Sequence, residues 1–534
     1  MGLGALRRTD SAGHLTSCAA AHYKWLVMVD RPSGLRRGVL WCALLLWLVP
    51  GSAFGQPAGT NHKAMADKAS AALEAGNFPE AIGLLRALVA DLPDDPGLHL
   101  NLGMALTMSG QPADAVPVLE RALALQPDML PGNLFLGLAH LESGSPGKAV
   151  TPLEKVVAVD RDNAYARQAL GQAYTMLEQH DRAVEQFEAL RRTQPQDPQL
   201  IAALGQGYER VARQAFEQLQ ELDPDSPHVW LLVADVLRVQ ENYPQAFELL
   251  RKAQQALPDF PGIHESVADI YAATGHADWA ETEKARATAP DCTRLPVACA
   301  FLGGQHHDAL ARTRGATQPA ALYWRARAAN ELASRTFDQL AQLPPSVAGH
   351  LVRADIYRAQ GQPLPAAEQL RQALALAPGN VEIERDLAGA LFAARNTDEA
   401  LPLLAKLVAQ TPDDAELSVG YGEMLVQTQQ MEKAIPVLQK ALAAKPGLMQ
   451  GHSALGRALL ATGDAAGAVP HLEQALPLDE DGSLHYQLAQ AYMRTEQAER
   501  AKPLLEKYRE MQQAAQAPQD DTPAPTATIT PPVR

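Results

Sequence analysis

Histidine invites the first chemical interpretation of this sequence, because it recurs at one place of a repeating pattern. In windows of 34 residues the fourth place holds His99, His264, His350, His452 and His485. A metal site would need these side chains to converge, but only the last two belong to neighbouring windows. The adjacent His306 and His307 point in two directions on a helix and have no cysteine or carboxylate at ligand spacing. We therefore expect packing positions at the fourth place, a solvated histidine pair and no metal site.

Cys292 and Cys299 are the only cysteines that follow an apolar leader, and no CxxC or zinc-type spacing is present. On one helix, residues seven places apart lie about 10 Å apart along the axis, too far for a disulfide. Pro296 suits the first turn of a helix, which would leave Cys292 in the preceding loop and free to fold back. We predict a disulfide between the two, with two free buried thiols as the alternative.

The sequence contains no motif of a known catalytic centre. A nucleophile elbow, a phosphate loop, an HExxH pair and a dinucleotide-binding fingerprint are all missing. Repeats occupy almost the whole of the chain that could fold, so no stretch is left for a catalytic domain. We expect no enzyme, no cofactor and no small-molecule substrate.

The charge balance disfavours nucleic acid as a partner. The 534 residues carry a formal net charge of −15, and residues 56–534 hold 40 Lys/Arg against 59 Asp/Glu. A phosphate backbone would be repelled by this field, and no basic arm offsets it.

An apolar leader precedes the acidic part of the chain. Residues 38–49 are apolar after the opening glycine, follow three arginines, and are followed by small residues at Ala53 and Gly55. This is the pattern of a secretory signal cut after Gly55, and the apolar run is shorter than the ~20 residues that span a bilayer. A start at Met28 gives a leader of ordinary length.

We therefore expect residues 1–27 to be an extension upstream of the true start and 28–55 to be a signal peptide. The protein would be exported and periplasmic. The alternative is an inner-membrane anchor formed by an uncleaved leader, the only contact with a membrane that we expect.

A period of 34 residues fills the rest of the chain. Eleven windows begin at residues 62, 96, 130, 164, 227, 261, 347, 381, 415, 449 and 482. The eighth place is always Gly or Ala, the twentieth is always Ala, and proline often closes the window. Apolar residues three and four apart on either side of a central break predict two amphipathic helices joined by a tight turn. Such pairs cannot cover their apolar faces alone and must stack.

These columns, as in LNLGMAL and ADAVPVLERALALQPD within residues 100–128, resemble the tetratricopeptide repeat. The resemblance covers residues 62–508 and extends to exported bacterial proteins with many such repeats. It implies an all-α fold, a right-handed α-α superhelix of about eleven regular helix pairs plus degenerate units. Its concave groove would be lined by the first helix of each pair.

Two units depart from the period in the same way. Residues 198–226 and 319–346 both lack five residues between their helices, at a fixed offset of 121 residues. Each could form one long helix. The shared defect at a fixed offset favours an ancestral duplication, and tolerated drift of a degenerate repeat is the alternative. The sequence predicts a repeat array at 62–226 with a short unit at 198–226, repeats at 227–290, degenerate repeats at 291–346, a second array at 347–508, and a disordered tail at 509–534.

The resemblance also implies which side chains line the groove. In this family they come from the second, fifth, ninth, twelfth and thirteenth places, and a familiar clamp uses lysine and asparagine there to hold a peptide carboxylate. Here the corresponding residues are Leu100, Met104, Thr107, Met108, Leu134, Leu138, Leu141, Gln168, Gln172 and Met176; further along, the ninth place is acidic at Asp235, Asp269, Asp355 and Glu423.

The carboxylate clamp is absent from this groove. An apolar floor with methionines suits an amphipathic helix or an extended apolar segment. The alternative is that these side chains only pack between neighbouring first helices.

The expected function is that of a protein-protein interaction scaffold in the cell envelope, which binds protein or peptide partners in the groove. The alternative is a structural subunit of a secretion or polysaccharide-export assembly.

Overall fold

A computed structural model describes residues 60–516 and 529–532, so the expected upstream extension and signal peptide lie outside the described residues. All regular structure in the described residues is helical, which confirms the predicted all-α class. No helix there is long and apolar enough to cross a membrane. The chain forms two compact units, here called the N-terminal unit (60–344 with 529–532) and the C-terminal unit (345–516).

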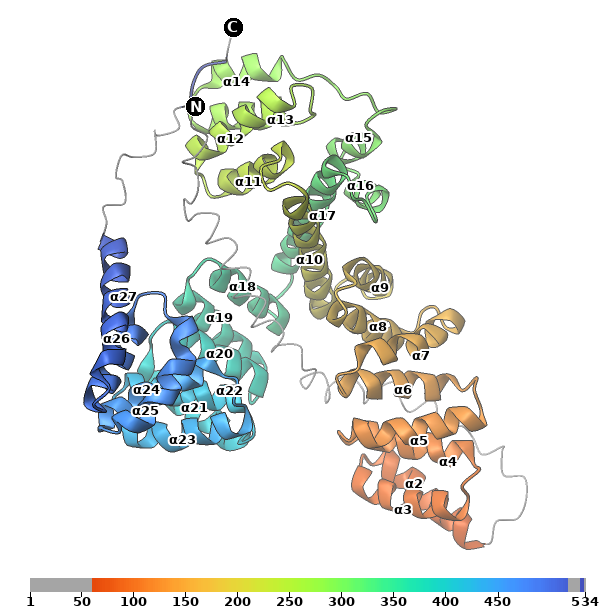
Figure 1. Ribbon diagram of the computed structural model, residues 1–534. Helices are drawn as coiled ribbons and strands as arrows, with labels where there is room; N and C mark the ends of the chain where they lie inside the picture. Colours follow the sequence, from red (N-terminus) through yellow and green to blue (C-terminus); the bar gives the residue numbers. More distant parts are fainter. Residues whose placement is uncertain (1–59, 517–528, 533–534) are drawn as a thin grey trace. The chain divides into compact units, whose positions relative to one another are not determined.

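The N-terminal unit opens with four antiparallel helix pairs and continues with two more after a single long helix (Figure 1). The opening pairs are α2 (Thr60–Glu74) and α3 (Phe78–Asp91), α4 (Pro96–Met108) and α5 (Pro112–Leu125), α6 (Leu130–Glu142) and α7 (Pro146–Val159), and α8 (Ala164–Met176) and α9 (His180–Thr193). The later pairs are α11 (Pro227–Val239) and α12 (Tyr243–Ala256), then α13 (Ile263–Ala273) and α14 (Ala277–Lys284). A shortened pair follows: α15 (Pro296–Leu302) and α16 (His306–Arg312).

The C-terminal unit consists of five regular pairs, which brings the regular pairs to the eleven that the period predicts. They are α18 (Val347–Ala359) and α19 (Pro363–Leu376), α20 (Val381–Ala393) and α21 (Thr397–Gln410), α22 (Ala415–Gln427) and α23 (Met431–Ala444), α24 (Met449–Thr462) and α25 (Ala465–Ala475, followed by η3, Leu476–Leu478), and α26 (Ser483–Arg494) and α27 (Ala498–Gln516).

The close approach of the two helices in each pair explains why the eighth place of the period is always Gly or Ala. A Cβ on Gly103 would lie 2.4 Å from Cγ of Leu119, the twenty-fourth residue of the same window. The same holds for Gly137 and Leu153, also at 2.4 Å. The second helix therefore packs a large side chain directly on the backbone of the first, and Ala115 and Ala149 at the twentieth place are completely buried.

The turn between the two helices depends on one residue with a left-handed backbone. The fifteenth place of every regular window has a positive φ, from 55° at Arg395 to 95° at Gly463. Five of these residues are not glycine, which makes the conformation strained there. The two short units lack the residues that would form this turn.

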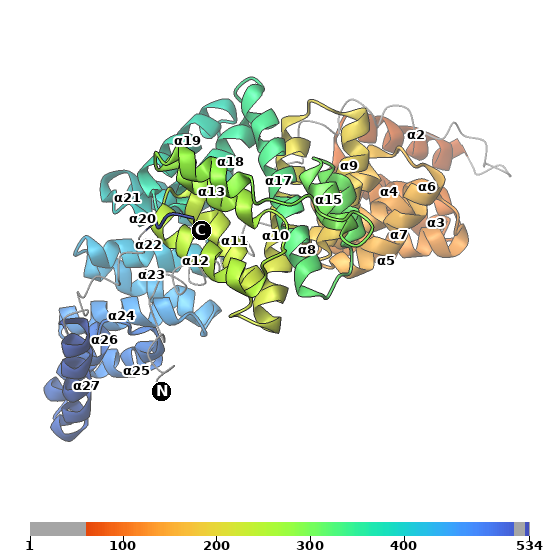
Figure 2. The ribbon, with the colours of Figure 1, turned by 90° about the horizontal axis from the view of Figure 1, so that it is seen from above.

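Without that turn, each short unit is one continuous helix: α10 (Pro198–Leu222) and α17 (Pro319–Gln342). The expectation of fused helices is therefore confirmed. The two helices lie side by side in both views (Figure 1, Figure 2) and pack closely along their lengths. The short units thus form no helix pair on their own and pair with each other.

The pairing of α10 with α17 is reciprocal and follows the rule of the ordinary pairs. A Cβ on Gly205 of α10 would lie 2.5 Å from Cε1 of Phe337 in α17, so Phe337 takes the place of the missing second helix. Leu204 of α10 shares a core with Leu332 of α17. The other ends also share a core, in which Leu219 packs with α17 residues 322–326.

Two further expectations need correction. Helix α27 continues to Gln516, beyond the predicted start of a disordered tail at 509. Within that tail, residues 529–532 are described, and Ile529 packs against a core cluster of the N-terminal unit. The histidine pair is not uniformly solvated either, because His306 is 6% exposed and packs edge-on against Phe301.

We predict that Gly205→Ala will lower the free energy of unfolding by about 1–3 kcal/mol, because its Cβ would clash with the ring of Phe337. Combining it with Phe337→Ala should relieve the clash, so that a double-mutant cycle in urea gives a coupling of roughly 0.5–3 kcal/mol. Gly83→Ala is the control, since its Cβ would meet nothing within 4 Å. Additive effects at Gly205 and Phe337 would contradict the reciprocal pairing.

Candidate functional site

The predicted groove residues divide into buried and partly accessible side chains. Leu100 and Leu141 are only 6% and 3% exposed and belong to core clusters. The half-buried residues are Met104, Met108, Leu134, Leu138, Gln168, Gln172 and Met176. Leu138 contacts the clusters on both sides of it, so these side chains also pack between neighbouring first helices. A partner could reach only the half-buried set.

The acidic ninth places further along are neutralised by arginines. In the N-terminal unit Arg238 reaches both Asp235 and Asp269, at 3.3 and 2.9 Å, and Arg327 of α17 lies 3.2 Å from Asp235. The first helices α11 and α13 are therefore joined by an alternating row of charges. This stretch is unsuited to a strongly basic peptide, because its carboxylates already have partners.

A similar group in the C-terminal unit contains a carboxyl group with a perturbed pKa. Arg358 pairs with Asp355 on α18 and lies 3.6 Å from Asp386 on α20. Burial raises the pKa of Asp386 to about 6, although the charge of Arg358 acts in the opposite direction. Asp355 and Glu382 raise it further by repulsion.

The histidines at the fourth place make hydrogen-bond contacts with preceding turns or with other side chains. Nε2 of His99 lies 2.8 Å from the carbonyl oxygen of Pro93, and His452 makes the same contact with Pro446 at 2.9 Å. The other three contact side chains: His264 with Glu283, His350 with Gln369, and His485 with Asp479. In the described residues no group of three or more His, Cys, Asp or Glu could hold a metal ion.

The sulfur atoms of Cys292 and Cys299 are bonded at 2.09 Å, and their Cα atoms lie 5.6 Å apart. Pro296 is the first residue of α15. Cys292 therefore lies in the loop before the helix, the arrangement that makes a bridge across seven residues possible.

A recurrent polar contact joins consecutive helix pairs on the side of their second helices. The hydroxyl of Tyr174, at the eleventh place, donates to Glu154, at the twenty-fifth place of the preceding window, at 2.7 Å. Tyr208 donates in the same way to Glu188 at 2.6 Å. Tyr492 and Glu473 repeat the contact in the C-terminal unit.

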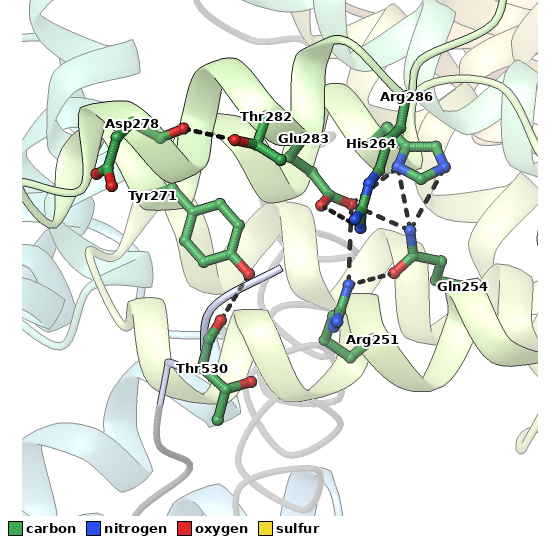
Figure 3. A network of polar contacts seen from close by, with 9 residues as sticks. All are labelled: Arg251, Gln254, His264, Tyr271, Asp278, Thr282, Glu283, Arg286 and Thr530. Carbon is green, nitrogen blue, oxygen red and sulfur yellow. Dashed lines mark hydrogen bonds and ion pairs between the residues drawn. The ribbon is translucent and has the colours of Figure 1, made fainter. Parts of the chain in front are cut away.

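Tyr271, also at the eleventh place of its window, makes a different contact. The twenty-fifth place of the preceding window is Arg251, which is drawn toward Glu283 of α14 instead (Figure 3). Glu283 is completely buried, and its carboxylate also contacts His264 at 2.8 Å and Arg286 at 3.4 Å. Two arginines and a histidine thus surround one buried carboxylate.

Tyr271 then finds another acceptor. Its hydroxyl donates to the backbone carbonyl of Thr530 at 2.6 Å, and the C-terminal segment runs past the ring (Figure 3). Its ring lies edge-on to Trp279, which stands where Arg182 and Arg500 stand over the tyrosines of other windows. Arg251 and Trp279 can be read from the sequence, but only the structure shows what occupies the surface beside them.

Comparison with known families agrees with the helix-pair architecture. Two family models described as tetratricopeptide repeat match the chain, one at residues 66–129 and 199–261, the other at residues 140–207, 357–418 and 391–458. Together they match more than half of the chain. A search of curated proteins found no match.

Solved structures resemble parts of the chain. MamA MSR-1 is 25% identical with a TM-score of 0.28, over 32% of this chain and 98% of its own. MamA from Desulfovibrio magneticus RS-1 is 20% identical with a TM-score of 0.29, over 33% and 97%. A tetratricopeptide repeat protein from Parabacteroides merdae is 14% identical with a TM-score of 0.29, over 62% and 100%.

We predict that Glu283→Ala will destabilise the N-terminal unit by about 1–3 kcal/mol, because the half-buried Arg251, His264 and Arg286 side chains lose the carboxylate that they share. Denaturant unfolding followed by tryptophan fluorescence measures this change. Glu281→Ala, at an exposed position of the same helix, should change the stability by less than about 0.5 kcal/mol. Equal effects of the two variants would contradict the assigned network.

The raised pKa of Asp386 predicts a pH dependence. The folded chain holds this proton more tightly than the unfolded chain, so the group's contribution to stability is full below about pH 4 and is lost as pH rises to about 6. Asp386→Asn cannot ionise, and should gain stability relative to wild type between pH 4.5 and 7. Thermal melts at both pH values test this, with the exposed Asp398→Asn as control. A pH-independent difference would show that Asp386 titrates normally.

Proposed function

The chain belongs to the tetratricopeptide repeat family, and from this premise we propose that it is a non-enzymatic scaffold that binds protein or peptide partners along its first helices. The observation that carries the proposal is the row of half-buried apolar side chains on α4, α6 and α8, with Met104, Leu138 and Met176 among them. These side chains are neither fully buried nor matched by charges.

The chemistry of this row favours an apolar partner. The corresponding places hold no lysine or asparagine that could clamp a terminal carboxylate. Methionine adapts its shape to different partners, and an amphipathic helix laid across first helices would cover the accessible apolar area. The proposed ligand is therefore an amphipathic helix or an extended apolar segment of another protein.

We place the scaffold in the cell envelope, in the periplasm. The support is the leader at residues 28–55 together with the bond between Cys292 and Cys299, since disulfides persist mainly outside the reducing cytosol. An uncleaved leader would instead anchor the same scaffold to the inner membrane.

A capture experiment from envelope extracts distinguishes two roles of the protein. Several weak partners that share a short motif support the scaffold, whereas one stoichiometric partner supports a subunit of a secretion or polysaccharide-export assembly.

We predict that Met104→Asp combined with Leu138→Asp will abolish partner capture, because two charges would be introduced into the apolar row. Far-UV circular dichroism should show unchanged helicity. The matched control is Ala113→Asp with Val159→Asp, two exposed positions on the second helices α5 and α7. Loss of helicity in the first variant would show that both residues are core, and retained capture would place the partner elsewhere.

A further inference from the structure

The surface formed by α12, α13 and α14 carries a short segment from the end of the chain. Ile529 is half-buried against the apolar cluster that contains Phe247 and Tyr271, and the next residue accepts the tyrosine hydroxyl. This hydrogen bond joins two residues that are 259 positions apart in the sequence. The contact is therefore not one that the 34-residue repeat produces between neighbouring windows.

The surface lacks the glutamate that accepts a tyrosine hydroxyl at three other places in the chain. Tyr174, Tyr208 and Tyr492 each donate to a glutamate. Tyr271 instead faces Arg251, which lies 3.8 Å from the buried Glu283. Phe247, 5.5 Å from the tyrosine ring, and Trp279, 5.6 Å from it, supply an aromatic surrounding. One hydroxyl donor amid aromatic rings suits an uncharged backbone better than a charged side chain.

The segment has the matching chemistry. Residues 529–532 read Ile-Thr-Pro-Pro and carry no charge. Pro531 biases Thr530 toward an extended backbone, and the two prolines have no N–H groups that would need partners. The extended form is therefore partly organised before binding, which reduces the entropy lost when it docks.

We propose that the α12–α14 surface is a binding site for extended, uncharged segments of the Ile-Thr-Pro-Pro type, and that the chain's own residues 529–532 occupy it. This second interaction surface is separate from the apolar row on α4, α6 and α8. Attachment within one chain gives the segment an effective concentration on the order of millimolar, so it outcompetes a second copy at micromolar protein.

The test uses the full chain with Ile529→Asp, which places a charge in the apolar contact and vacates the surface. A fluorescent peptide of residues 525–534 is titrated against this variant and against wild type by anisotropy. It should bind the variant saturably and wild type at least about tenfold more weakly, because the resident segment competes. Absence of saturable binding, or equal binding to both proteins, overturns the proposal.

Two hydroxyl variants locate the peptide. In the Ile529→Asp background, Tyr271→Phe keeps the ring and removes the donor, and should weaken peptide binding by about fivefold. Tyr174→Phe should leave it unchanged, because that hydroxyl serves Glu154. Equal effects of the two variants on peptide binding would show that the peptide does not bind at the α12–α14 surface.

Sedimentation of the wild-type protein decides the source of the segment. A monomer supports occupancy within one chain, and a dimer that Ile529→Asp dissociates overturns it. The variant Met104→Asp with Leu138→Asp should bind the peptide as its parent does, so this proposal and the one for the apolar row can fail separately.

Discussion

The N-terminal unit depends on the mutual pairing of α10 and α17. A helix of about 25 residues without an internal turn cannot fold back to cover its own apolar face, so it needs an antiparallel partner of equal length. The second fused helix supplies that partner, with Phe337 on Gly205 in place of the missing contact. The chain must therefore run from the end of α10 through helices α11 to α16 and come back to α10 at the start of α17. Arg325 of α17, 5% exposed, adds a bond of 2.6 Å to Asp181 of α9.

This return also explains where the few aromatic residues are used. Although aromatic residues make up only 5% of the chain, all three tryptophans of the described residues lie between positions 230 and 324. Phe260 stacks on Trp324 at 5.6 Å and meets Tyr323 edge-on. Regular pairs close with leucine and alanine because their geometry is repeated, whereas the junction of α17 with the loop after α12 is irregular. Large rings fill such a space with few residues.

The windows predicted what depends on neighbours in sequence: the eleven pairs, the small eighth place and the two fused helices. They could not predict that α10 pairs with α17, because a hydrophobic period states which face is buried and does not name the partner. The end of the chain escaped prediction for a related reason. Its composition argues correctly that residues near Ile529 cannot build a core, yet four residues need only a surface that is already folded.

On that surface an arginine precedes a tyrosine whose counterparts in three other places face a glutamate, and this combination has two coupled consequences. A glutamate at the place of Arg251 would accept the hydroxyl of Tyr271, as Glu154 does for Tyr174. The arginine instead turns to the buried Glu283, whose charge could not be buried without cationic partners. Arg251 thus helps to stabilise the pair α13–α14 and leaves the hydroxyl of Tyr271 free to donate to the backbone of Thr530.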